Sequence, residues 1–147
     1  MSDRYVDELE PGETHSIGPR PVTRGEIVSF AERDDPQRMH VDEDAARESQ
    51  FGTLIASGWH TGSISMRLVV DALFADVAVV GALGVDELRW TNPVTPGDEL
   101  RESVSVTEKE RWSDRNGLVG FDIETRNQND ETVVTRTDLV LVERARP

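Results

Sequence analysis

The chain contains no cysteine, and this absence excludes several kinds of site. No disulfide framework, thiolate nucleophile or cysteine-ligated zinc centre can form. Three histidines are present, but they are scattered and lack the spacing of a ligand set, so we expect no metal ion. Any acid–base chemistry must therefore come from carboxylates, histidine or hydroxyl groups.

Long apolar runs are also missing. No stretch approaches the ~20 consecutive apolar residues that a membrane-spanning helix requires. The first residues, Met1 to Tyr5, do not combine a basic segment with an apolar one, so we expect no signal peptide. These two features predict a cytoplasmic protein.

Positive charge is scarce, and lysine occurs once, as Lys109. The chain carries 16 basic and 29 acidic residues, for a net charge of -13. Such a surface repels phosphate backbones and anionic lipids, so neither nucleic acid nor a membrane is an expected partner. Many carboxylates with almost no lysine are typical of proteins from a salt-rich cytoplasm, where the Debye length falls to ~3 Å. This hypothesis predicts a folded fraction that rises with KCl, and equal stability at low and molar salt would contradict it.

The length of 147 residues fits one domain, expected to span residues 1–147. A helix is indicated where Thr23 and Glu26 have the spacing of a capping box. Pro36 ends this helix, because the residue before a proline avoids the helical conformation. A second, shorter helix is expected to begin at Asp42.

A third helix, from Trp59 to about Phe74, is apolar on most sides and is expected to be buried. After Ala75 the hydrophobic pattern changes to a period of two, which is typical of strands. Strands are expected near residues 13–17, 87–91, 103–107, 119–124 and 132–142. The sequence therefore predicts an α+β fold, in which an antiparallel sheet wraps around a long central helix.

The stretch from Asp35 to His40 is the first candidate for chemistry. Asp34 and Asp35 fall at the C-terminal end of a helix, where the helix dipole disfavours carboxylates. A loop through Pro36 can bend Asp35 and His40 toward one point, where they could hold a water for general acid–base chemistry. The simpler interpretation is that Asp35 caps the loop and His40 is a surface residue.

The second candidate is Ser57-Gly58, which follows a short apolar strand expected at residues 54–56. Gly58 allows a close approach to the backbone, and free N–H groups at a helix start can stabilise an oxyanion. By sequence alone, an ordinary turn with Ser57 as N-cap is the favoured interpretation. His60 is expected to bond to neighbouring backbone and His15 to be exposed. Ser57 and His60 lie three residues apart at one helix start and nothing marks Ser57 as activated, so we expect no Ser57–His60 catalytic pair.

These stretches together resemble the MaoC-type dehydratases, which are hot-dog domains related to the (R)-specific 2-enoyl-CoA hydratases. The resemblance covers about Pro11 to Val142. The matching residues are Asp35-Pro36-Gln37, His40, Asp42-Glu43, Ala45-Ala46, Phe51-Gly52, Ile55-Ala56-Ser57-Gly58-Trp59-His60-Thr61, Trp90-Thr91-Asn92-Pro93-Val94 and Pro96-Gly97-Asp98.

The resemblance implies a function and a site. Asp35 and His40 would deprotonate a water that attacks C3 of a trans-2-enoyl-CoA, giving a (3R)-hydroxyacyl-CoA reversibly. The N–H of Gly58 would polarise the thioester carbonyl, and Gln37 and Ser57 would support the pair. The implied substrate contains coenzyme A, so no separate cofactor is expected. The resemblance also implies a homodimer paired edge to edge, with active sites near the shared interface.

The chain departs from the family pattern at Arg38 and Met39, where close relatives usually carry proline and an aromatic residue. Arg38 would favour an acidic acyl group, reach a CoA phosphate, or remain a solvated surface charge. Two other functions stay open: a hot-dog acyl-CoA thioesterase and a non-catalytic acyl-CoA-binding subunit. The presence of both Asp35 and His40 favours the hydratase.

Overall fold

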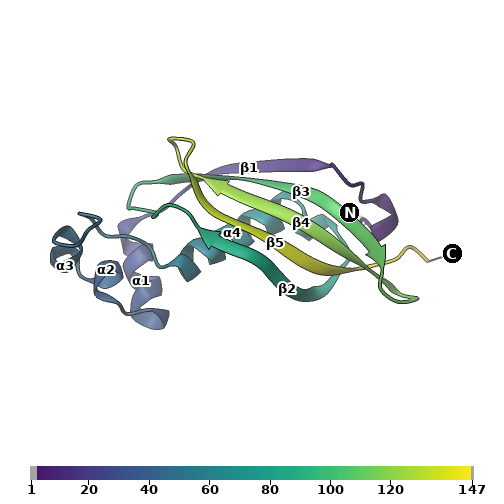
Figure 1. The fold of residues 1–147 in the computed structure, drawn as a ribbon, viewed down its shortest axis with the longest axis horizontal. Helices are drawn as coiled ribbons and strands as arrows, with labels where there is room; N and C mark the ends of the chain where they lie inside the picture. Colours follow the sequence, from purple (N-terminus) through teal and green to yellow (C-terminus); the bar gives the residue numbers. More distant parts are fainter. Residues whose placement is uncertain (1–2, 147) are drawn as a thin grey trace.

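The computed structural model, which describes residues 3–146, has a five-stranded antiparallel sheet with one long helix packed on it (Figure 1). The strand order is β1-β3-β4-β5-β2. The strands are β1 (Thr14–Pro21), β2 (Val79–Trp90), β3 (Glu99–Arg111), β4 (Asn116–Arg126) and β5 (Thr132–Glu143). The helices are η1 (Val6–Glu8), α1 (Arg24–Asp34), α2 (Arg38–Val41), α3 (Glu43–Arg47), α4 (Gly58–Ala72) and η2 (Phe74–Asp76). The α+β hot-dog prediction is confirmed.

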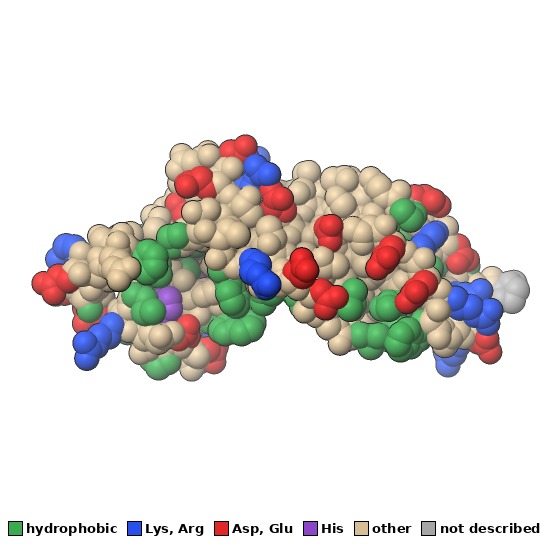
Figure 2. Space-filling view, in the orientation of Figure 1, with side chains coloured by type: hydrophobic (Ala, Val, Ile, Leu, Met, Phe, Trp, Pro, Cys, Tyr) green, Lys and Arg blue, Asp and Glu red, His purple; other side chains and the backbone are tan. Residues whose placement is uncertain are grey.

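The three helices α1, α2 and α3 gather at one end of the sheet, beside the start of α4 (Figure 1). On the face seen in Figure 2, hydrophobic side chains collect near these helices and again toward the far end, with acidic groups between them. No helix among residues 3–146 is long and apolar enough to cross a membrane.

Local sequence signals set the helix boundaries. The Thr23 hydroxyl accepts the Glu26 N–H at 3.2 Å, and the Glu26 carboxylate accepts the Thr23 N–H at 2.7 Å, which forms the expected capping box. The helix α1 ends at Asp34, directly before Asp35-Pro36. On α4, Arg67 and Asp71 are four residues apart and form an ion pair of 3.0 Å.

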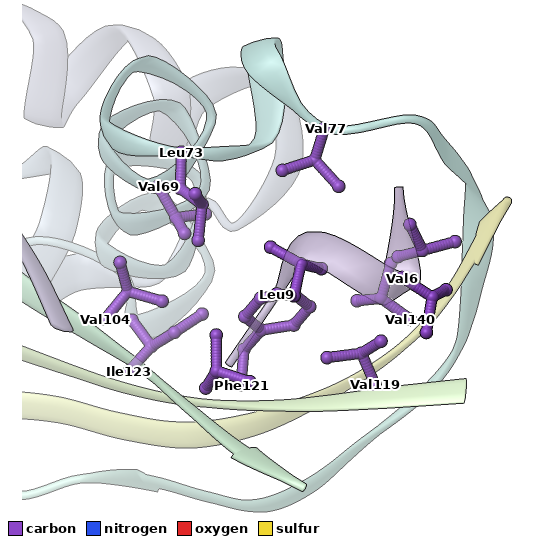
Figure 3. Close-up of a cluster of buried hydrophobic side chains, with 12 residues drawn as sticks. Val6, Leu9, Val69, Leu73, Val77, Val104, Val119, Phe121, Ile123 and Val140 are labelled. Carbon is purple, nitrogen blue, oxygen red and sulfur yellow. The ribbon is translucent and has the colours of Figure 1, made fainter. Parts of the chain in front are cut away.

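Alternating side chains of β3, β4 and β5 face α4 and form the core. Phe121, Val104 and Val119 are at most 1% exposed and pack with Val69 and Leu73 of α4 (Figure 3). A second cluster, formed around residues such as Ile27, Leu54, Ile64 and Val133, lies toward α1. The helix is therefore held from one end to the other by apolar contacts.

The strand expected near residues 87–91 is present but longer than expected, and one expected strand is absent. The strand expected near residues 87–91 begins much earlier, at Val79, and residues 54–56 join no strand. Register shifts break the pairing of β2 with β5 at three places, and Glu87 has a positive φ of 52°. Such bulges interrupt the alternation from which a strand is predicted. Residues 54–56 are instead held by single backbone bonds, such as the 2.8 Å bond from Ala56 to Val94.

A group of polar side chains is buried as well. Glu102 accepts hydrogen bonds from the hydroxyls of Ser65 and Thr125, the latter at 2.7 Å, and burial raises the pKa of Glu102 to about 7. Arg136 pairs with Asp138 at 2.8 Å, and both are at most 6% exposed. Buried charges remain in place only when they are paired or bonded in this way.

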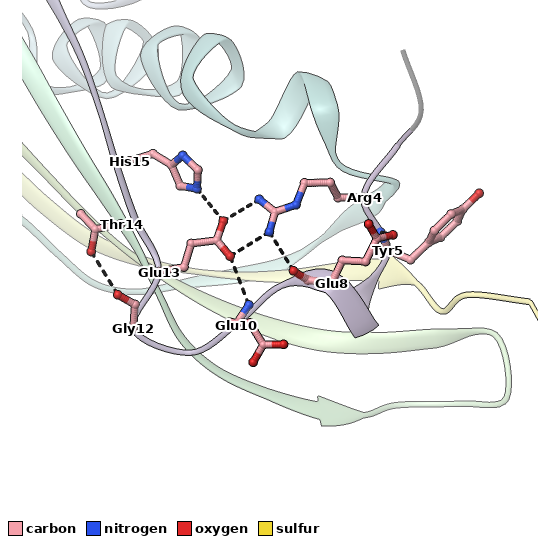
Figure 4. A network of polar contacts seen from close by, with 8 residues as sticks. All are labelled: Arg4, Tyr5, Glu8, Glu10, Gly12, Glu13, Thr14 and His15. Atoms are coloured by element: carbon pink, nitrogen blue, oxygen red, sulfur yellow. Dashed lines mark hydrogen bonds and ion pairs between the residues drawn. The ribbon is translucent and has the colours of Figure 1, made fainter.

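A second polar network ties the N-terminal segment to β1 (Figure 4). The Glu13 carboxylate contacts the Arg4 guanidinium at 2.5 and 2.8 Å and the His15 ring at 2.5 Å. The hydrogen bonds from Arg4 are the main reason that the pKa of Glu13 falls to about 2. His15, expected to be exposed, is thus partly buried in this network.

Candidate active site

Asp35 follows the last residue of α1 and turns the chain out of the helix. Its N–H still donates to the carbonyl of Ala31 at 2.8 Å, while its backbone angles are no longer helical. Pro36 then prevents the helix from continuing. The carboxylate is thereby presented beyond the helix end, on a side chain that is 18% exposed.

His40 lies in the short helix α2 rather than in a loop, and it is 5% exposed rather than at the surface. Its Nδ1 atom lies 2.7 Å from the carbonyl oxygen of Ile55. Because a carbonyl can only accept, Nδ1 carries the proton in the neutral ring and Nε2 presents a lone pair. That Nε2 atom lies 3.5 Å from Oδ2 of Asp35.

The remaining contacts of Asp35 keep its carboxylate ionised. The Ser57 hydroxyl donates to Oδ2 at 2.6 Å, and the Gln37 amide donates to Oδ1 at 2.7 Å. These two hydrogen bonds, with that of Ser57 the stronger, lower the pKa of Asp35 below its usual range. In the neutral form of the His40 ring, Nε2 and the Asp35 carboxylate are thus two acceptors facing one another. A single water molecule can satisfy such a pair by donating one hydrogen to each.

Ser57 and Gly58 form the beginning of α4. The Ser57 oxygen accepts the N–H of Trp59 at 3.3 Å, so the serine caps the helix while it also binds Asp35. Among the described residues, no hydrogen bond is made by the N–H of Gly58, as is usual in a first helical turn. Ser57 can therefore serve as the N-cap of α4 while the N–H of Gly58 remains free to donate a hydrogen bond.

Trp90 covers Gly58, a contact that no local residue pattern predicts. Its indole N–H donates to the Gly58 carbonyl at 2.7 Å across 32 residues of sequence. A Cβ atom at Gly58 would lie 2.6 Å from Cε2 of Trp90, so only glycine fits beneath the ring. Trp59 meets the same ring edge-on, with centroids 5.1 Å apart.

These elements enclose a hollow of about 400 Å³. It is lined by Asp35, Gln37, His40, Phe51, Gly58 and Trp90, among others. The predicted site residues therefore lie together, apart from Ser57, which reaches the hollow through Asp35. Their catalytic roles stay predictions. No group of three or more side chains among residues 3–146 is arranged to hold a metal ion.

His60 does not line this hollow. It is 6% exposed, stacks on Phe30 with centroids 4.9 Å apart, and its Nδ1 has no hydrogen-bond partner within the described part of the chain. The expected bond to backbone is therefore not made by Nδ1. Desolvation by burial lowers the pKa of His60, which keeps the ring neutral and suits a packing role between α1 and α4.

Comparison with known proteins identifies the family. The model of the MaoC-like domain matches residues 8–128. The chain belongs to the MaoC-like dehydratase family. A MaoC-like dehydratase from Rhodospirillum rubrum is 37% identical, with a TM-score of 0.88, and the match covers 98% of this chain and 99% of that one.

Two further proteins are similar to this chain. The uncharacterized protein YdeM of Bacillus subtilis is 31% identical over 139 residues, which cover 95% of this chain and 99% of YdeM. The R-hydratase PhaJ1 of Pseudomonas aeruginosa is 25% identical with a TM-score of 0.77, and the match covers 97% and 86% of the two chains. The family therefore includes hydratases as well as dehydratases.

Ser57→Ala is expected to raise the pKa of Asp35. The variant removes the strongest hydrogen bond that favours the ionised carboxylate, so protonation on acidification begins at a higher pH than in the wild type. Loss of the cap also costs about 1 kcal/mol of stability. A 13C NMR titration of the Asp35 carboxyl measures the shift, with Ser63→Ala, an exposed site on α4, as control. An unchanged titration would remove Ser57 from the support of Asp35.

Proposed function

We propose that this MaoC-like protein is a hydratase/dehydratase that interconverts a trans-2-enoyl-CoA and a (3R)-hydroxyacyl-CoA. One observation carries the proposal. The Asp35 carboxylate and Nε2 of His40 lie 3.5 Å apart, at the wall of a hollow that the start of α4 also lines. This arrangement suits a bound water and a thioester carbonyl side by side.

The chemistry follows from the protonation states. In hydration, the Asp35–His40 pair removes a proton from the water as its oxygen attacks C3 of the enoyl group. The electrons of the C2=C3 bond move toward the carbonyl oxygen, and the N–H of Gly58 stabilises the enolate. The pair then returns the proton to C2 on the same face. Dehydration runs through the same steps in reverse.

A thioesterase is the second candidate, because a hot-dog domain can direct an activated water at the carbonyl carbon instead. The two activities release different products. Hydration removes the conjugated double bond and keeps the thioester, whereas hydrolysis releases a free thiol. The paired acceptors favour hydration, because one group can hold the proton until C2 receives it.

We also propose that the chain acts as a cytoplasmic homodimer joined through β2. This strand is at the sheet edge and exposes Val79, Val80, Leu83 and Val85, which lie 40–53% exposed. An exposed apolar edge strand is a strong template for pairing with another copy. Sedimentation of the wild type and of Leu83→Lys tests this, since a lysine on the edge should produce monomers.

The deciding assay uses crotonyl-CoA, with enoyl absorbance and a free-thiol reagent followed together in molar KCl. Loss of absorbance without thiol release is the expected result. Thiol release would establish the thioesterase. If no enoyl-CoA is turned over, including branched and acidic ones, the protein is an acyl-CoA-binding subunit instead.

A further inference from the structure

We propose that Arg38 binds the phosphate groups of the coenzyme A moiety, in a second hollow that continues from the candidate active site. This inference rests on the proposed function, because it assigns the nucleotide end of the same substrate. It concerns a position where the chain carries a cation that the site's acid–base chemistry does not use.

The second hollow adjoins the first through a shared wall. It has a volume of about 560 Å³ and is lined by Arg38, Met39, Glu48, Ser49, Gln50 and Phe51, among others. Phe51 also lines the hollow that contains Asp35 and His40. Its ring is 52% exposed, so it offers an apolar surface between the two hollows. A substrate bound at Asp35 can therefore extend past Phe51 to Arg38.

Arg38 is available to a ligand. It is exposed and forms no ion pair within residues 3–146, whereas its neighbours along the chain are engaged: Arg33 pairs with Asp34 at 2.9 Å and Arg47 with Asp44 at 3.1 Å. Glu48 lines the same hollow but does not pair with Arg38. A planar guanidinium with free donors is the side chain best suited to phosphate.

Location distinguishes Arg38 from other arginines without an ion pair in the described chain. Arg101 lines a hollow beside β1 and β3, while Arg115, Arg144 and Arg146 line one near the C-terminal end. Neither of these hollows shares a residue with the candidate active site. Arg38 follows Asp35 by three residues, which keeps it within about 11 Å of the Asp35 backbone.

Charge and solvent exposure favour phosphate over an acidic acyl group. The protein carries a net charge of -13, so a multiply charged nucleotide is repelled at long range and needs a local cation to bind. Phosphates stay partly hydrated, and the Arg38 side chain lies in solvent rather than inside the core. Glu48 opposes an anion in this hollow, so its neutralisation should strengthen binding.

The test compares two substrates that differ only in the nucleotide end. Arg38→Ala should raise KM for crotonyl-CoA about tenfold with kcat nearly unchanged, and leave both constants for crotonyl-pantetheine unaltered. Arg38→Lys should recover part of the loss, and Glu48→Gln should lower KM. Arg47→Ala, an exposed arginine on α3, is the matched control and should behave as wild type, with all assays in the same KCl concentration.

Calorimetry with CoA alone separates this inference from the proposed function. Wild type should bind CoA about tenfold more tightly than Arg38→Ala whether or not an enoyl group is hydrated. Equal CoA affinities, or an equal loss on crotonyl-pantetheine, would overturn the assignment. If Arg38→Ala raised KM only for enoyl-CoA substrates with a carboxylated acyl group, the assignment would also be overturned. Arg38 would then contact the acyl group and not the phosphates.

Discussion

Asp35→Asn is expected to lower kcat for crotonyl-CoA hydration about a thousandfold, the usual contribution of a positioned general base. The amide has the same shape and can still accept the hydrogen bond from Ser57, which is 2.6 Å long in the wild type. It cannot take a proton from water. The fold should therefore persist while the acid–base step is lost.

Asp34→Asn is the matched control for this substitution. Asp34 lies one residue earlier, at the end of α1, and its carboxylate pairs with Arg33 at the surface. The control should keep wild-type activity, and thermal unfolding of both variants should show similar stability. A fully active Asp35→Asn enzyme would show that another group removes the proton.

Gly58→Ala is expected to lower kcat about a hundredfold, as the loss of one oxyanion donor does in other enzymes. The new methyl group would lie 2.6 Å from Cε2 of Trp90, closer than carbon atoms can approach. The indole must move, which breaks its 2.7 Å hydrogen bond to the Gly58 carbonyl and shifts the first turn of α4. Steady-state kinetics with crotonyl-CoA measures the loss.

Gly62→Ala offers a control within the same helix. A Cβ atom at Gly62 has no neighbour within 4 Å, and alanine is favoured over glycine inside a helix by up to about 1 kcal/mol. This variant should stay active and unfold at a slightly higher temperature. If Gly58→Ala were as active as Gly62→Ala, the close contact of Gly58 with Trp90 would not matter for the reaction.

Local signals in the sequence determined most of the secondary structure. The capping box at Thr23 and Glu26, the stop at Pro36 and the long apolar α4 depend on neighbours within a few residues, so they can be read without the fold. The same holds for β3, β4 and β5, whose side chains alternate between the core and solvent. Their period of two survives because their pairing is nearly regular.

The start of β2 and the helix α2 were missed for two different reasons. In β2, bulges and the positive φ of Glu87 remove the alternation. The four residues of α2 are too few to show a helical period, and their conformation depends on burial of His40 beside Ile55. Short elements of this kind are stabilised by tertiary contacts more than by their own propensity.

The sequence by itself determined the fold class, the family resemblance and the identity of the candidate pair, Asp35 and His40. Only the tertiary structure decided how the pair is supported. Ser57 reaches Asp35 across 22 residues and Trp90 reaches Gly58 across 32, and the hollow of Arg38 meets the site at Phe51. Contacts between distant segments depend on how α1, α4 and the sheet pack together, and local residue patterns do not encode that packing.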